Sequence, residues 1–160
     1  MTIVPTSFQT TISVRRATLD VFDDAKRLLI EYFDVIGVLL CDDDIAMRSL
    51  ISDSDSGFWL AYVDSVAAGC VALRPLSAIP GAGECKRLYV RQQFRRRGVA
   101  GALISSMERD AAALGYAAIY LDSKDDLRAA IALYERAGYI SCPRYNDNPQ
   151  ATVFMSKTLG

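Results

Sequence analysis

A short basic loop precedes a segment with helical periodicity, and its residue types suit the binding of an anion. Three arginines and two glycines mark it: Arg95, Arg96, Arg97, Gly98 and Gly101. Apolar side chains recur at helical spacing over residues 99–114, which places the start of a helix directly after Gly98. The first amides of a helix lack intrahelical partners, and the helix dipole adds about half a positive charge there. Because glycine lets a ligand approach the backbone closely, the loop predicts a diphosphate site.

The spacing of these residues resembles a known family. Arg95-x-x-Gly98-x-Ala100 fits the Gln/Arg-x-x-Gly-x-Gly/Ala loop of the GCN5-related N-acetyltransferases (GNAT family), which binds the diphosphate of acetyl-coenzyme A. Ahead of the loop, residues 86–90 (Lys-Arg-Leu-Tyr-Val) look like the fourth strand of that family. Behind it, residues 130–139 (Ala-x-x-Leu-Tyr-Glu-x-x-Gly-Tyr) are similar to its Ala-x-x-Leu-Tyr-Glu-x-x-Gly-Phe signature. The resemblance extends from about Ile12 to Leu159.

Two positions depart from the pattern of the family. Arg96 stands where many members carry a glycine, which predicts a different loop shape. Leu127 stands where many members carry an asparagine, so we do not expect this chain to make the polar contact to the pantetheine arm that the asparagine would make.

The resemblance implies acetyl-coenzyme A as the cofactor and names the residues that bind it. A bulge at Leu88–Val90 is expected to separate strands four and five, so that free main-chain groups bind pantetheine and polarise the thioester carbonyl. An ordinary buried strand is the alternative there, and a solvated surface run is the alternative for the three arginines. The expected cofactor-binding residues are Leu88, Tyr89, Val90, Arg95, Arg96, Arg97, Gly98, Val99, Ala100, Gly101 and Tyr134.

Transfer of an acyl group to an amine needs a base and benefits from an acid. Deprotonating a lysine-like ammonium at pH 7 costs about 4–5 kcal/mol, so a base must lie close to the amine. Glu84 opens the expected fourth strand and is the candidate base; the alternative is an ion pair with Lys86 or Arg87. By its place in the family signature, Tyr134 is the candidate acid that protonates the departing thiolate, and the alternative is a core aromatic.

The acceptor is expected to be a primary amine on a small molecule or a peptide. Residues 145–149 (Tyr-Asn-Asp-Asn-Pro) look similar to a Tyr-x-x-Asn-Pro turn in one bacterial branch of the family. Tyr145 and Asn148, with Tyr32 from the first helix, are the candidate acceptor-pocket residues. Ordinary turn chemistry explains the same residues equally well. The identity of the amine is left open, because pocket shape decides it.

Composition excludes several other classes of protein. With 51% hydrophobic and 23% charged residues the chain is globular, and its net charge of −1 gives no reason to expect nucleic acid or a membrane as partner. The chain has no histidine, and its cysteines (Cys41, Cys70, Cys85 and Cys142) are scattered, so we expect no metal site and no Ser-His or Cys-His dyad. Free thiols predict a reducing, cytoplasmic location. A homodimer is possible.

The elements that must position these residues follow an α/β order. We expect residues 1–11 to form a flexible arm and residues 12–160 to form a single acetyltransferase domain. Thr18 is the expected N-cap of a helix that reaches Ile36. The predicted fold is a mixed, mostly antiparallel sheet of six to seven strands with strands four and five splayed, flanked by about four helices. The expected strands are 12–15, 58–63, 66–73, 84–90, 117–121, one from 139–140 and one with 152–155; the helices are 18–36, 43–51, 99–114 and 126–137.

Three rival functions deserve comparison. A dinucleotide-binding domain would need the full Gly-x-Gly-x-x-Gly pattern on a first strand, which the chain lacks. A nucleoside triphosphatase would need Gly-x-x-x-x-Gly-Lys-Ser/Thr, which is also absent. A sensor that binds an acyl-coenzyme A without transfer needs only the diphosphate loop, whereas an enzyme also needs the chemistry of Glu84 and Tyr134.

Overall fold

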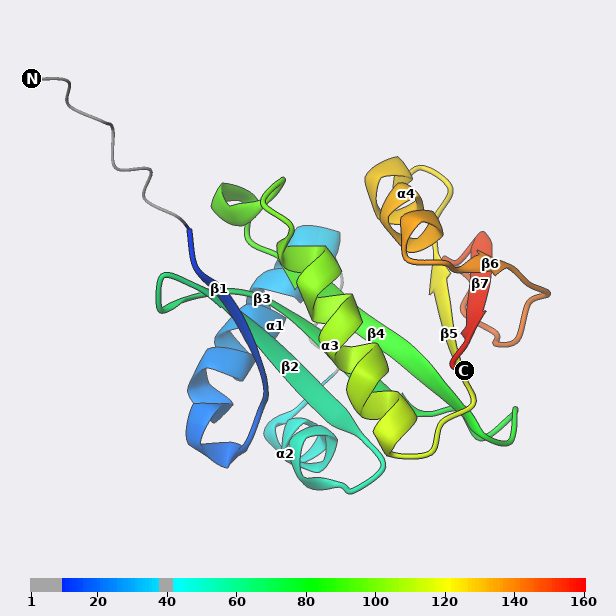
Figure 1. Ribbon diagram of the computed structural model, residues 1–160, viewed down its shortest axis with the longest axis horizontal. Helices are drawn as coiled ribbons and strands as arrows, with labels where there is room; N and C mark the ends of the chain where they lie inside the picture. The colour runs from blue at the N-terminus through cyan, green and yellow to red at the C-terminus, as the bar shows by residue number, and fades with distance from the viewer. Residues whose placement is uncertain (1–9, 38–41) are drawn as a thin grey trace, which may run out of the picture.

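One mixed sheet of seven strands forms the centre of the protein. The computed structural model describes residues 10–37 and 42–160. The strands lie in the order β1-β2-β3-β4-β5-β7-β6, and only the β4–β5 pair is parallel (Figure 1). Their bounds are β1 Ile12–Arg16, β2 Gly57–Val63, β3 Val66–Pro75, β4 Ala82–Val90, β5 Ala118–Ser123, β6 Ile140–Ser141 and β7 Val153–Thr158. The sheet therefore has the mixed, mostly antiparallel form predicted from sequence.

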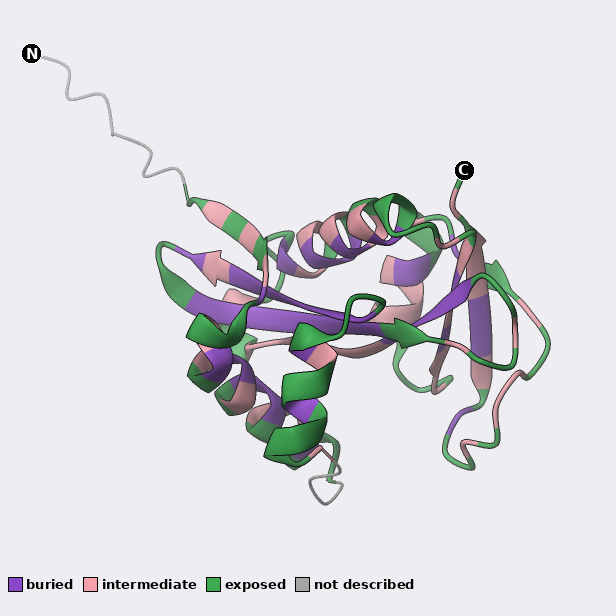
Figure 2. Ribbon diagram, turned by 90° about the horizontal axis from the view of Figure 1, so that it is seen from below, coloured by how far each residue is buried: buried purple, intermediate pink, exposed green. Residues whose placement is uncertain are grey.

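Helices cover both faces of this sheet (Figure 2). On one face α3 (Val99–Ala113) packs Leu103, Ile104 and Met107 against the strands, in a core that also holds Tyr134 of α4 (Arg128–Arg136). On the other face α1 (Phe22–Ile36) and α2 (Asp44–Ser52) form a second core with β2 and β3. Apolar burial on both faces explains why β2 and β3 read as nearly continuous apolar runs.

Single residues determine where α1 and α2 end or begin, and the start of α1 differs from the prediction. Asp43 caps α2 by accepting a hydrogen bond from the amide of Ala46 at 2.8 Å, and Gly37 ends α1 in a left-handed conformation. Thr18, in contrast, caps no α-helix, because a 3₁₀ turn over Leu19–Val21 comes before α1 and the Thr18 hydroxyl bonds to Asp20 instead. Most of the predicted N-terminal arm (residues 1–9) and Cys41 lie outside the described residues.

A bulge in β4 opens the sheet. The register between β3 and β4 shifts between Cys70 and Ala72, where Arg87 takes a φ of +60°. The parallel ladder between β4 and β5 joins Ala82–Glu84 to Ala118–Tyr120 and goes no further. The two strands then diverge, with β4 continuing beside β3 and β5 turning towards β7 (Figure 1). The predicted splay of strands four and five is thereby confirmed.

Candidate active site

The loop between β4 and α3 presents open space over a helix N-terminus. Gly98 is the N-cap of α3 and has a φ of +82°, a conformation that other residues adopt only at a cost. A Cβ atom built on Gly98 or on Gly101 would meet no heavy atom within 4 Å. Val99 is buried and anchors the helix, whereas Gly101 is exposed and Ala100 is partly exposed. The first turn of α3 is therefore accessible to a ligand, as an anion site requires.

The three arginines of the loop are exposed, but they differ in their contacts. Arg95 donates from Nε to the carbonyl oxygen of Val90 at 3.0 Å, and the Arg97 guanidinium lies over the Phe94 ring. Arg96 has a φ of +64° and has no side-chain partner among the described residues. A positive φ suits glycine, the residue that the resemblance leads us to expect at this position. Two of the cations are thus fixed beside the helix N-terminus, while the third projects from a strained backbone.

Beyond the point of divergence, β4 exposes one edge of its backbone. Lys86, Tyr89 and Val90 are held by β3 on the other edge. No strand in the described part of the chain pairs with the edge that faces β5 beyond Glu84. Leu88 and Val90 pack towards the α3 side of the sheet, and Tyr89 packs towards the α1 side. The side of Leu88–Val90 that faces β5 therefore has no strand partner among the described residues, and the Val90 carbonyl oxygen accepts a hydrogen bond from Arg95.

Glu84 lies at the base of this opening with both carboxylate oxygens engaged. Its side chain is only 4% exposed. Oε1 accepts from Arg74 Nε at 3.1 Å and Nη2 at 3.0 Å, while Oε2 accepts from the Tyr145 hydroxyl at 2.9 Å and Asn146 Nδ2 at 3.3 Å. Lys86 Nζ lies 3.4 Å from Oε2, so the ion pair with Lys86 that was considered above is present. Arg87 bonds to Asp42 instead, at 3.0 and 3.3 Å.

A second carboxylate, Asp122 of β5, lies beside Glu84. Lys86 and Asn146 each contact both carboxylates: Asp122 Oδ2 is 3.5 Å from Lys86 Nζ and 2.6 Å from Asn146 Nδ2. Asn148 Nδ2 also lies 3.5 Å from that oxygen. The two acids are thus bridged by a shared cation and a shared amide, which offsets the cost of placing two negative charges together.

Tyr134 of α4 is buried beside this group, with 7% of its surface exposed. Its ring makes an edge contact with Tyr139 at 6.0 Å between centroids. Burial, with a smaller contribution from neighbouring Cys85, Tyr32 and Asp122, raises the pKa of the Tyr134 phenol well above its usual range. At neutral pH the phenol therefore carries its proton, as a hydrogen-bond donor to a thiolate must.

The candidate acceptor residues fall in two places around the opening. The Tyr145 hydroxyl contacts Glu84, and Asn148 contacts Asp122. Tyr32 lies away from these residues, in edge contact with Tyr89. Burial raises the pKa of the Tyr32 phenol, and the charge of nearby Arg87 opposes part of this effect. The structure therefore places Tyr145 against Glu84 and Asn148 against Asp122, and it keeps Tyr32 beside Tyr89 near the bulge.

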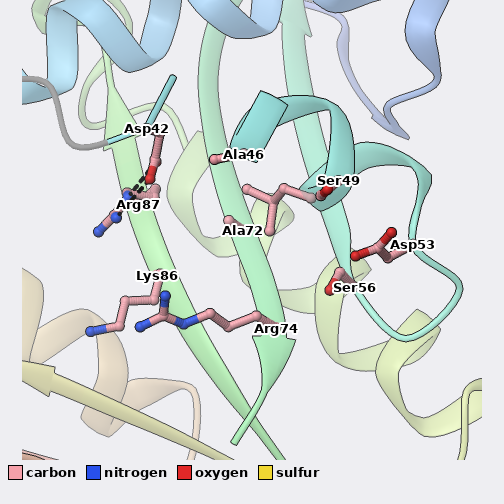
Figure 3. Close-up of a pocket in the computed structure, with 10 residues that line it drawn as sticks. Asp42, Ala46, Ser49, Asp53, Ser56, Ala72, Arg74, Lys86 and Arg87 are labelled. Atoms are coloured by element: carbon pink, nitrogen blue, oxygen red, sulfur yellow. Dashed lines mark hydrogen bonds and ion pairs between the residues drawn. The ribbon is translucent and has the colours of Figure 1, made fainter. Parts of the chain in front are cut away.

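A cavity of about 260 Å³ opens between α2 and strands β3 and β4. Figure 3 shows Lys86 and Arg74 beside one another and the Asp42–Arg87 pair farther along β4. Tyr32, Tyr145 and Asn148 do not belong to its wall. The lining residues are Asp42, Ala46, Ser49, Leu50, Asp53, Ser56, Ala72, Arg74, Lys86 and Arg87.

Several residues of this site escaped the sequence analysis. Asp122 and Arg74 belong to no motif, and Asn146 stands at a variable position of the 145–149 turn. Their partners lie on other elements of the fold. Among the described residues, no three potential ligand side chains lie where they would hold a metal ion. No helix in the described ranges is both long enough and apolar enough to cross a membrane.

A sheet that opens at a bulge beside an accessible helix N-terminus, with acids and a phenol at the opening, is the architecture of an N-acetyltransferase. The rival dinucleotide-binding fold, a doubly wound parallel sheet, is excluded by the strand order. The profile of the Acetyltransferase (GNAT) family matches residues 21–139. The chain belongs to this family.

Relatives agree with this membership, and a solved structure shares the fold. The chain is 34% identical over 133 residues to an uncharacterized N-acetyltransferase of Schizosaccharomyces pombe, covering 79% of this chain and 81% of the relative. It is 32% identical over 121 residues to human N-acetyltransferase 8, covering 72% of this chain and 51% of that protein. The PaiA N-acetyltransferase from Thermoplasma acidophilum in complex with coenzyme A has the same fold, with a TM-score of 0.68 at 16% identity over 92% of this chain and 99% of that one.

Proposed function

We propose that this acetyltransferase moves an acetyl group from acetyl-coenzyme A to a primary amine, by direct attack in a ternary complex. The observation that carries the proposal is the end of the β4–β5 ladder at Glu84 and Tyr120, next to the accessible N-terminus of α3. The amine would belong to a small molecule or a peptide. Direct transfer needs no nucleophile from the protein, which suits a site without histidine.

The cofactor is held by two kinds of backbone group in this proposal. The amides of Val99, Ala100 and Gly101 receive the diphosphate, with Arg95, Arg96 and Arg97 around it. The open edge of Leu88–Val90 receives the pantetheine arm. The open space over Gly98 and Gly101 supports the first assignment, and the absence of a strand partner among the described residues supports the second.

The reaction forms a C–N bond and breaks the C–S bond of the thioester. The amine nitrogen attacks the carbonyl carbon, the oxyanion collapses, and the thiolate departs with a proton donated by Tyr134. Glu84 is the proposed base, and its occupied oxygens call for a relay. The Tyr145 hydroxyl can pass its proton to Glu84 Oε2, 2.9 Å away, while it takes one from the amine.

The test is release of free coenzyme A thiol across a panel of amines. Tyr134→Phe and Glu84→Gln are each expected to lower kcat by up to about 10²–10⁴-fold, the usual contribution of one acid or base, with coenzyme A affinity retained in calorimetry. Tyr116→Phe is the matched control, because its hydroxyl bonds to the Asp55 carbonyl at the far end of α3.

Each outcome separates one part of the proposal. Unchanged turnover in both variants would remove these two side chains from the mechanism. Binding of coenzyme A without thiol release from any amine would identify a sensor of acyl-coenzyme A instead of an enzyme. Failure to bind coenzyme A at all would contradict the role of the α3 N-terminus.

A further inference from the structure

Asp122 occupies a central place at the opening of the sheet. It lies on β5 two residues beyond Tyr120, the last residue of β5 that pairs with β4. Its side chain is 12% exposed, so it is neither sealed in a core nor free on the surface. Its neighbour Leu121 is buried in the core on the α3 side, which directs Asp122 to the opposite face, where Glu84 and Lys86 lie.

The two oxygens of Asp122 differ in their surroundings. Oδ2 lies within 3.5 Å of donors on Lys86, Asn146 and Asn148, which fix the orientation of the carboxylate. Within residues 10–37 and 42–160, no group donates a hydrogen bond to Oδ1. Glu84 has no comparable open oxygen, because Arg74 occupies Oε1 and Tyr145, Asn146 and Lys86 surround Oε2.

Asp122 also lies among the aromatic side chains that surround the opening. Burial raises the pKa of the Tyr134 phenol on α4 and of the Tyr145 phenol on the loop before β7, and the charge of Asp122 adds to both effects. It acts in the same direction on Tyr32 of α1. One carboxylate is therefore near the candidate acid and near candidate acceptor residues on both sides.

We propose that Asp122 is a catalytic base for the acetyl transfer, and that its open oxygen Oδ1 takes the proton directly from the attacking amine. This inference depends on the proposed function. Oδ1 takes one proton from the bound ammonium, which frees the nitrogen lone pair to attack the carbonyl carbon and form the C–N bond. The C–S bond electrons leave with the thiolate, which takes a proton from Tyr134, and the second proton that the nitrogen loses restores the Tyr134 hydroxyl. Glu84 contacts Lys86 and Asn146, and these two side chains in turn position Asp122. Glu84 also provides the indirect path for the amine proton through the Tyr145 hydroxyl.

The competing explanation is that Asp122 only anchors Asn146 and Asn148. A base and an anchor differ in how they depend on the protonation of the acceptor. An alkylamine is protonated at pH 7, whereas an alkoxyamine is neutral there and needs no base before it attacks. Loss of a base therefore harms transfer to the first amine much more than to the second, while loss of an anchor harms both.

The experiment measures thiol release by the full chain, wild type against Asp122→Asn, with both amines. The variant is expected to lose about 10²–10⁴-fold in kcat with the alkylamine, and far less with the alkoxyamine. Coenzyme A affinity and melting temperature serve as folding controls. Asp23→Asn, an exposed carboxylate in the first turn of α1, is the matched control and should leave both activities unchanged.

A pH series adds a second readout. Alkylamine activity of the variant should recover about tenfold per pH unit from pH 7 towards the amine pKa, as the neutral fraction grows. The charged groups that face Asp122 are Lys86 and Glu84 of β4. Its titratable neighbours Tyr32, Tyr134, Tyr145 and Cys85 all have a raised pKa, so their neutral forms persist through pH 7–9.

Three results would overturn the role of Asp122, and they are distinguishable. Equal losses of kcat with the two amines would assign an anchoring role to Asp122. A variant with the same turnover as the wild type would show that Asp122 takes no part in proton transfer. A wild type that releases thiol with no amine of the panel would refute the proposed function itself, and the role of Asp122 would fall with it. The expected result is a loss of kcat that is large only with the alkylamine and becomes smaller at high pH. This result would establish Asp122 as the base.

Discussion

Gly101 offers a test of the diphosphate site in which stability and affinity move in opposite directions. It is the third residue of α3 and is exposed, and a Cβ atom there would meet nothing within 4 Å. A new side chain at this position therefore costs no clash. Whatever it does to ligand binding comes from occupying or charging the space over the helix N-terminus.

Gly101→Asp should stabilise the ligand-free protein. An acidic side chain in the first turn of a helix adds about 0.3–1 kcal/mol, and replacing a helical glycine adds a few tenths more. For a chain of this size, a gain of about 0.5–1 kcal/mol raises the melting temperature by roughly 1–4 °C. Gly101→Asn is the matched control, because it fills the same volume without the charge.

The same substitution should weaken binding of coenzyme A. A unit charge about 4 Å from another costs about 1 kcal/mol in water, and a diphosphate carries about two. The aspartate variant should therefore bind about 2 kcal/mol more weakly than the asparagine variant, or roughly thirty-fold. Calorimetry at low and high salt should show this gap shrinking as ions screen the repulsion.

Pantetheine, which lacks the diphosphate, is the control ligand, and the two variants should bind it equally. Equal affinities of the variants for coenzyme A would refute a diphosphate at this helix end. An aspartate variant that melts below the asparagine variant would refute the dipole argument, since it would show that the carboxylate finds no favourable field there.

Two further predictions concern stability. Arg96→Gly should stabilise the fold by about 0.5–1 kcal/mol, because glycine removes the cost of a left-handed φ, about 1–2 kcal/mol, but also makes the unfolded chain more flexible, which costs about 0.4–1 kcal/mol. In thermal unfolding, Arg97→Gly should show no such gain. Equal changes in the stability of the two variants would contradict the strain at Arg96. Burial raises the pKa of the Cys85 thiol from 9.0 to about 12, so unfolding releases its proton above pH 9 and stability falls as pH rises from 9 towards 12. Urea unfolding at pH 8 and pH 10 should show a shallower fall in Cys85→Ala than in the wild type, and equal slopes would show that this thiol does not contribute.

Local sequence patterns predicted most of the elements, since these depend on neighbouring residues. The helical period over 99–114 and the glycine at its start placed α3 to within a residue. Thr18 misled because it stands before a 3₁₀ turn rather than an α-helix, and its hydroxyl bonds to the Asp20 side chain instead of capping a backbone amide. The departure at Arg96 was visible in the sequence, but its cost became clear only from the backbone conformation.

The candidate site was predicted less completely, because its contacts join distant parts of the chain. Asn146 and Asp122 are 24 residues apart, and Arg87 and Asp42 are 45 apart. No local pattern marks such pairs, since the bulge and the register of β7 against β5 determine which side chains meet. Glu84 was found from its place on the strand. Asp122 was missed because it follows an ordinary apolar strand segment without a motif.

The interrupted β4–β5 ladder also has a consequence for solubility. Beyond Glu84, no strand in the described ranges pairs with the side of β4 that faces β5, and an unpaired strand edge is the kind that recruits strands from other chains. The charged pair Arg87–Asp42 and the cation Lys86 stand along that edge and discourage such pairing. An extended cofactor arm that lies along the same edge would therefore act as a cap against aggregation as well as a reactant.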